Sequence, residues 1–234
     1  VYITYKVLDF ADLTVDGSLA TGGAVAVMCM LNGANTYVAL ILAFLAGMLA
    51  GLVTGLFHTA LGIPPILAGI LTQLGLYSIN MRIMGKANQA ISVMQYDVLV
   101  SLRYIPHACL LTTGFCIVII ALLYWFFGTE IGASVRATGC NPNMARAQGI
   151  NTNATKVLGL VISNGLVGLA GALYAQYQGS ADINMGRGAI VIGLAAVIIG
   201  EVVFGKIFHN FALHMVAVVI GAIIYFVVIA IVLQ

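Results

Sequence analysis

Four long stretches of the chain carry no acidic or basic side chain, and they limit what it can fold into. They run from Gly17 to Met81, from Tyr104 to Thr129, from Val157 to Ala181 and from Ile207 to Gln234. A helix crosses the hydrocarbon of a bilayer with about 20 mostly apolar residues, so the first stretch can hold more than one crossing and each of the others can hold one. We therefore expect an all-α, polytopic bundle of transmembrane helices.

The composition agrees with lipid as the solvent. Hydrophobic residues make up 62% of the 234 residues and charged residues only 7%, whereas a soluble domain has about 45–50% apolar and about 25% charged residues. A chain of this length cannot bury so much apolar surface in a core of its own. The net charge of +2 gives no electrostatic reason for a nucleic-acid partner. The composition thus disfavours secreted proteins, nucleic-acid binders and soluble enzymes.

Apolar runs between helix breakers divide the chain into helices and connections. The segment 19–31 is too short to cross, so we expect a half-helix near the N-terminus that opens inside the bundle. Residues 81–106 are polar and predict a loop that can hold a short helix. Both ends look cut, and we expect one transmembrane domain over residues 1–234 that lacks spans at each end. The other predicted helices are residues 37–57, 64–80, 107–127, 154–177, 188–204 and 211–233.

The distribution of Lys and Arg predicts the orientation, because cytoplasmic loops are enriched in these residues. Residues 130–156 carry Arg136, Arg146 and Lys156, and the turn 205–210 carries Lys206. With both in the cytoplasm, helices 107–127 and 188–204 run inward, whereas helices 154–177 and 211–233 run outward. The polar residues 81–106 then lie outside despite Arg82, Lys86 and Arg103, so the orientation needs a second support.

Glycines at helical spacing predict closely packed helices. Gly47, Gly51 and Gly55 share one face of their helix, and Gly165, Gly168 and Gly171 lie within residues 154–177. Small residues at this spacing let two helix backbones approach each other. A moving or dimeric interface and static packing are equal alternatives for these residues.

No cofactor or metal is expected. Residues 200–206 have the spacing of a phosphate-binding loop, but Ile207 stands where Ser or Thr would hold Mg²⁺, and an apolar span precedes the motif. The cysteines form no CxxC pair and have no histidine at ligand spacing, so we expect them to pack as small apolar residues. They are Cys29, Cys109, Cys116 and Cys140.

The loop of residues 130–151 combines charge with helix punctuation between two apolar spans. Asn141 is a good N-cap, Pro142 suits the first helical position and Gly149 suits the position after the last turn, which predicts a short helix over 142–148. A second piece, 130–137, is expected to continue the preceding span and to end before a turn at Thr138 and Gly139. Two short helices are more structure than a simple connection between two spans requires, which indicates a functional loop. The alternative is a solvated loop without such a role.

This loop resembles the cytoplasmic loop of ABC importer permeases of the branched-chain amino acid and ribose type. The resemblance rests on the run Arg136-Ala137-Thr138-Gly139-x-Asn141 and on Ala145, Gly149, Ile150 and Asn151 that follow it. The glycine-rich span with Ser163-Asn164-Gly165 is similar to the next span of that family. Residues 8–18, LDFADLTVDGS, resemble the N-terminal signature of a branch of uncharacterised or aromatic amino acid permeases.

The resemblance implies a permease subunit that does not hydrolyse ATP itself. It implies a separate cytoplasmic ATPase, an extracytoplasmic binding protein and a second permease copy, in a bacterial inner membrane. The substrate would be a small solute, leaning towards amino acids. The loop is then cytoplasmic, which supports the orientation above. The implied ATPase-docking residues are Arg136, Ala137, Thr138, Gly139, Asn141, Pro142, Ala145, Arg146 and Gly149.

Polar residues in or before apolar spans are candidates for the substrate path, because polar groups in lipid usually face the bundle interior. We expect Asp12, Asp16, Ser18 and Asn164 to line the path. Simple capping of the short helix by Asp16 and Ser18 is the alternative. Glu201 is expected to pair locally with Lys206, and a functional place in the bundle interior is the alternative.

Two other classes compete with the importer subunit. A self-sufficient secondary transporter or channel is supported only by the polar groups within the spans. An intramembrane enzyme would need a nucleophile–base pair or a metal constellation, and the sequence shows neither at a readable spacing. The presence of an ATPase partner separates the first alternative from the importer.

Overall fold

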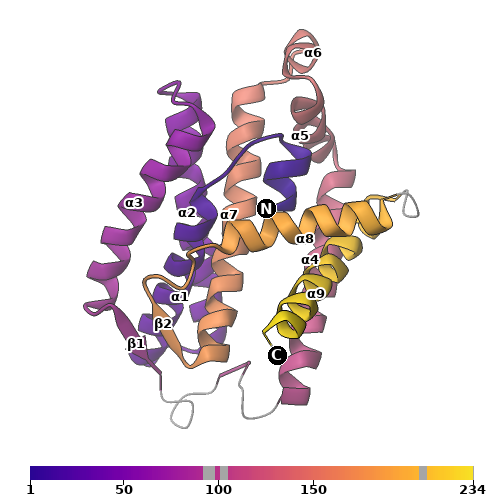
Figure 1. Ribbon diagram of the computed structural model, residues 1–234. Coiled ribbons are helices and arrows are strands. Elements are labelled where there is room, and N and C mark those ends of the chain that lie inside the picture. The colour runs from indigo at the N-terminus through magenta and orange to yellow at the C-terminus, as the bar shows by residue number, and fades with distance from the viewer. Residues whose placement is uncertain (92–97, 101–104, 206–209, 234) are drawn as a thin grey trace.

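The computed structural model describes residues 1–91, 98–100, 105–205 and 210–233 (Figure 1). Within them, six helices are long and apolar enough to cross a membrane. They are α1 (Thr14–Leu31), α2 (Thr36–Thr59), α3 (Pro65–Met84), α4 (Ile105–Gly128), α7 (Thr152–Gln178) and α9 (Phe211–Val232). The prediction of an all-α, polytopic bundle is confirmed.

The centre of the bundle is the packing of α7 against α1 and α2. A Cβ added at Gly51 would overlap the carbonyl oxygen of Leu160 on α7, and one at Gly171 would overlap that of Leu19 on α1. The predicted close packing of the glycine faces is therefore confirmed. In this chain the glycines of α2 meet α7 of the same chain, so backbone approach within one bundle explains their spacing.

The two ends of the bundle differ in structure. Helices α5 (Glu130–Cys140) and α6 (Pro142–Ala147) extend from one end, at the top of Figure 1. At the other end, strand β1 (Asn88–Ala90) pairs antiparallel with β2 (Ser180–Asp182), with Gln89 opposite Ala181. The strand pair was not predicted, and the short helix expected within 81–106 is absent from its described part, where α3 simply continues to Met84. Residues 92–97 and 101–104 lie outside the described residues.

The N-terminal helix is longer than predicted. Helix α1 begins at Thr14 rather than at residue 19 and has 18 residues, which is about 27 Å of rise. Its length is that of a membrane span, so the half-helix prediction is wrong for this segment. The sequence Asp16-Gly17-Ser18 reads as a helix start, but the helix runs through it. Its polar side chains have distant partners instead, backbone N–H groups of residues 188 and 190 for Asp16 and the side chain of Asn164 for Ser18.

Helix α8 (Ala189–Phe204) is the short helix of the bundle, with 16 residues or about 24 Å. Figure 1 shows it lying across the other helices at mid-height, where it packs mainly on α9. The prediction that residues 188–204 run inward as a span is therefore wrong. After β2 the chain runs back into the bundle before α8 starts. There the carboxylate of Asp16 on α1 accepts hydrogen bonds from the start of α8.

The N-terminal residues form one short helical segment, η1 (Ile3–Val7), which packs under the α4–α5 junction. Its Ile3 and Val7 belong to an apolar cluster with Phe127, Val135 and Leu160. This cluster connects the start of the chain to the helices on both sides of the 130–151 loop.

Candidate coupling and translocation sites

Helix α6 forms as the sequence predicts, because both of its ends are capped locally. The side-chain oxygen of Asn141 accepts hydrogen bonds from the backbone N–H groups of Asn143 and Met144, each at 3.1 Å. After the helix, Gly149 has a φ of +82°, and the N–H of Ile150 donates to the carbonyl of Ala145 at 3.0 Å. This is the Schellman arrangement that ends helices at glycine. The helix ends at Ala147, one residue earlier than predicted.

Helix α5 differs from its prediction at both ends. It does not continue α4, because Thr129 is extended and its hydroxyl accepts a hydrogen bond from the N–H of Gly132 at 3.3 Å, which starts a new helix. There is no turn at Thr138 and Gly139 either, since α5 continues to Cys140. A Cβ at Gly139 would overlap the carbonyl oxygen of Val7. The glycine is thus required by close approach to η1 and not by an unusual backbone conformation.

Both loop helices are fastened to α7. Arg146 Nε donates to Thr152 Oγ1 at 2.7 Å, which connects α6 to the first turn of α7. Thr138 Oγ1 lies 2.9 Å from Thr155 Oγ1, which connects α5 to the same turn. Thr138 and Ala145 are buried on this inner face. The exposed part of the predicted docking set is therefore Arg136, Asn141, Pro142, Arg146 and Gly149, with Ala137 and Gly139 half-buried.

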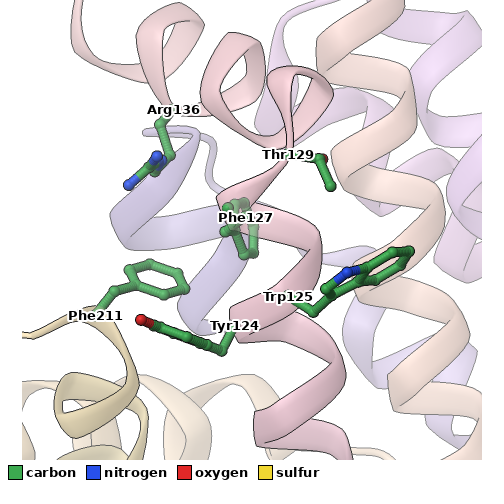
Figure 2. A pocket seen from close by; sticks show the side chains of 7 residues that line it. Tyr124, Trp125, Phe127, Thr129, Arg136 and Phe211 are labelled. Carbon is green, nitrogen blue, oxygen red and sulfur yellow. The ribbon is translucent and has the colours of Figure 1, made fainter.

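A hollow of about 450 Å³ lies where α4 ends and α5 begins, next to the first residue of α9. Figure 2 shows Arg136 reaching down from α5 towards the ring of Phe211, with Tyr124 below. Trp125 is 71% exposed and Tyr124 57% exposed. Exposed Trp and Tyr at the end of an apolar helix are typical of the boundary between hydrocarbon and water. The loop helices therefore begin at a membrane surface.

Three of the four predicted path residues meet in one buried cluster. Asn164 Nδ2 donates to Asp12 Oδ2 at 2.7 Å, and Ser18 Oγ donates to Asn164 Oδ1 at 2.7 Å. Asp12 Oδ1 also accepts from the N–H of Thr14 at 3.0 Å. All three side chains are at most 2% exposed. The cluster is satisfied from within, so it joins the start of α1 to α7.

Asp16 lies apart from this cluster and caps a different helix. Its Oδ2 accepts a hydrogen bond from the N–H of Gly188 at 3.0 Å and its Oδ1 accepts one from the N–H of Ile190 at 2.9 Å. The capping role considered for Asp16 is thus present, but on α8 and not on its own helix. A carboxylate at this place favours the helix because the first N–H groups lack partners and carry positive partial charge.

A chain of threonines was missed by the sequence reasoning. Thr54 Oγ1 on α2 lies 2.7 Å from Thr14 Oγ1 on α1 and 2.9 Å from Thr72 Oγ1 on α3. All three are buried. Isolated threonines in apolar spans give no pattern from which such a contact could be read.

Glu201 pairs with a residue far away in the sequence. Its carboxylate lies 3.0 Å from Lys6 Nζ, which forms a bridge between η1 and α8. Lys206 lies outside the described residues. The predicted pairing of Glu201 with Lys206 therefore stays a prediction, while the contact with Lys6, 195 positions away, could not be read from local spacing.

Six apolar spans around buried hydrogen-bonded clusters, with an ordered helical loop at one end, define a polytopic membrane protein. The family model described as "Branched-chain amino acid transport system / permease component" matches residues 1–234. The chain belongs to this permease family. It is therefore a transmembrane permease subunit, a multi-pass protein of the cell inner membrane, as its resemblance implied.

Relatives agree with this assignment. The chain is 41% identical over 225 residues to a tyrosine transport system permease protein of Clostridioides difficile (strain R20291), covering 96% of this chain and 74% of the relative. It is 37% identical over 238 residues to the uncharacterized protein RP368 of Rickettsia prowazekii (strain Madrid E), covering 100% and 82%. It is 28% identical over 192 residues to the autoinducer 2 import system permease protein LsrC of Escherichia coli (strain K12 / DH10B), covering 80% and 54%. No solved structure matches the chain.

Proposed function

We propose that this permease forms the translocation path of an ATP-binding cassette importer for an amino acid. A separate cytoplasmic ATPase drives it, and an extracytoplasmic binding protein delivers the solute. The observation that carries the proposal is the pair of capped helices α5 and α6, which extends from one end of the bundle between two spans (Figure 1).

The geometry of this pair suits the transmission of force. The pair joins α4 directly to α7, and its side chains are tied to α7 by the Arg146–Thr152 and Thr138–Thr155 contacts. A short helix with both ends capped moves as a rigid unit rather than unwinding. The exposed Arg136 and Arg146 can each form paired hydrogen bonds with carboxylates of an ATPase. Closure of the ATPase would then tilt α4 and α7 together.

The orientation of the bundle follows from this role. The α5–α6 end, with Arg136, Arg146 and Lys156, would be cytoplasmic, in agreement with the rule that positive charge stays inside. The opposite end, with β1 and β2, would face the binding protein. Exposed tyrosines near the C-terminus of α7, Tyr174 and Tyr177, fit a second membrane boundary there.

An amino acid is the solute class that the relatives favour. The relative from Clostridioides difficile is described as a tyrosine transport system permease protein. The description of the matching family names branched-chain amino acid transport. We extend only the shared class, an α-amino acid, to this chain.

The active form is proposed to be a two-fold dimer of this chain, or of this chain with a close paralogue, bound to two ATPase subunits. Helix α4 has only 6% of its span buried within one chain, which leaves apolar surface for lipid or for a second copy. Mass measurement of the active complex in mild detergent should give two permeases. A complex with one permease and full transport activity would contradict the dimer.

The proposal is tested by purifying the tagged full-length permease with its bound proteins and reconstituting it in liposomes. We expect an ATP-binding cassette ATPase to co-purify. We also expect amino acid uptake that requires ATP and the loaded binding protein. Uptake by the permease alone, driven by an ion gradient, would instead identify the secondary transporter considered from the sequence.

A further inference from the structure

A cavity of about 320 Å³ lies between α1, α3 and the segment 183–188 that joins β2 to α8. This volume is in the range of small-molecule sites. Its lining comes from the first turns of α1, from the second half of α3 and from the residues just before α8, elements whose positions Figure 1 shows. Its polar lining residues are Asp16, Gln73, Tyr77, Asn80 and Arg187, and its other lining residues are Gly17, Ala20, Leu74 and Ile183.

The cavity has charges of both signs that do not neutralise each other. Asp16 accepts one hydrogen bond on each carboxylate oxygen from the start of α8, and a carboxylate offers about four acceptor positions. The guanidinium of Arg187 forms neither a hydrogen bond nor an ion pair with the described residues, and the described ion pairs do not include Asp16 with Arg187. The space between them can therefore hold a solute that carries both charges.

Asn80 gives an independent sign of ligand binding. Its side chain is 1% exposed, and neither Nδ2 nor Oδ1 has a hydrogen-bond partner among the described residues. Buried polar groups without partners destabilise a protein, so they are rare. An amide that lines the cavity with a free donor and a free acceptor is well suited to a solute that presents both.

We infer that this cavity binds the zwitterionic end of an α-amino acid on its way through the permease. The inference rests on the proposed function and adds the site to it. Arg187 holds the carboxylate, the free lone pairs of Asp16 hold the ammonium group, and Asn80 bonds to either. The apolar residues Leu74 and Ile183, with Tyr77, face the side chain of the solute. Asp16 and Arg187 lie at the start of α8, which crosses the middle of the bundle, so the solute would be held part-way along the path.

The first test measures amino acid uptake by the reconstituted complex at saturating loaded binding protein. Arg187→Gln and Asn80→Leu should each lower the maximal uptake rate about tenfold or more, since each removes polar contacts to the solute. The concentration of binding protein at half-saturation should stay unchanged. Asn80→Leu should also keep or raise the melting temperature of the complex, because it removes two unpaired buried groups. Arg82→Gln, an exposed cation two residues from Asn80 on α3 but outside the cavity, is the matched control and should transport normally.

The second test examines direct binding to the permease–ATPase complex without binding protein. The probes are the standard L-amino acids, with L-tyrosine methyl ester and N-acetyl-L-tyrosine as analogues that lack one charge. The wild-type complex should be stabilised against heat by at least one free amino acid and by neither analogue. Arg187→Gln should lose this stabilisation.

The outcomes are separable. Wild-type amino acid uptake together with normal uptake by Arg187→Gln and Asn80→Leu would overturn this inference and leave the proposed function standing. A wild-type complex that imports no amino acid would overturn both. Stabilisation that depends on phosphatidylethanolamine, whose headgroup also carries an ammonium and an anion, and not on amino acids would overturn the assignment to a transported solute.

Discussion

The side-chain amide of Asn164 on α7 donates a 2.7 Å hydrogen bond to the carboxylate of Asp12, which precedes α1. Its oxygen accepts a hydrogen bond of the same length from Ser18. One amide thus forms hydrogen bonds with both a buried carboxylate and a buried hydroxyl. Both of these partners lie about 150 positions earlier in the chain. The contact fixes the start of α1 against the central helix, and its loss has a predictable cost.

Asn164→Leu should destabilise the permease, because it leaves the buried carboxylate of Asp12 and the hydroxyl of Ser18 without their partner. We expect a loss of about 3 kcal/mol, as for a buried charged group deprived of its hydrogen bond. Thermal unfolding of the purified permease–ATPase complex measures it. Ser163→Ala is the matched control, since the buried Ser163 hydroxyl has no partner among the described residues. The control should unfold at the wild-type temperature or slightly above, and equal temperatures for all three proteins would contradict the prediction.

Asp16→Asn should reduce uptake while the ATPase stays bound. The amide keeps one acceptor oxygen for the start of α8 but loses the negative charge that is proposed to hold the ammonium group of the solute. Uptake and ATPase co-purification are measured on the same preparation. Asp9→Asn is the control, because Asp9 is exposed and its φ of 50° suits Asn as well. Normal uptake by Asp16→Asn would leave Asp16 with a capping role only.

Gly139→Val should uncouple the ATPase from the permease without loss of membrane expression. The new side chain would collide with the backbone of Val7 and push α5 away from η1. We expect weaker ATPase association, or loss of the hydrolysis that the loaded binding protein stimulates. Gly75→Val is the control, because Gly75 is also helical but has open space where its Cβ would be. The two variants should therefore differ clearly, and equal coupling in both would refute the role of the α5–η1 contact.

Arg136→Glu should weaken ATPase association, since it reverses an exposed charge on the proposed docking face. The amount of ATPase that co-purifies with each permease variant is the measurement. Arg82→Glu makes the same change at the end of α3, away from α5 and α6, and should have no such effect. If Arg136→Glu retained its ATPase and transported normally, the loop would be a connector.

Local patterns were sufficient for the spans and for α6. The positions of α2, α4, α7 and α9 follow from apolar length, which needs no knowledge of neighbouring helices. The caps of α6 are Asn141 and Gly149, whose effects act within a few residues. The close packing of the glycine faces could also be predicted. Glycines at helical spacing indicate that another helix backbone approaches, but they do not indicate which helix it belongs to.

The sequence by itself thus determined that the chain is a membrane bundle with an ordered loop, since length, apolarity and caps are properties of single segments. Only the tertiary structure decided where α1 begins, that α8 lies across the bundle and which partners Asp16, Glu201 and Asn164 have. Each of these depends on contacts between residues more than 140 positions apart. A polar residue in an apolar run shows that a partner is needed, but the packing of the helices determines which residue provides it.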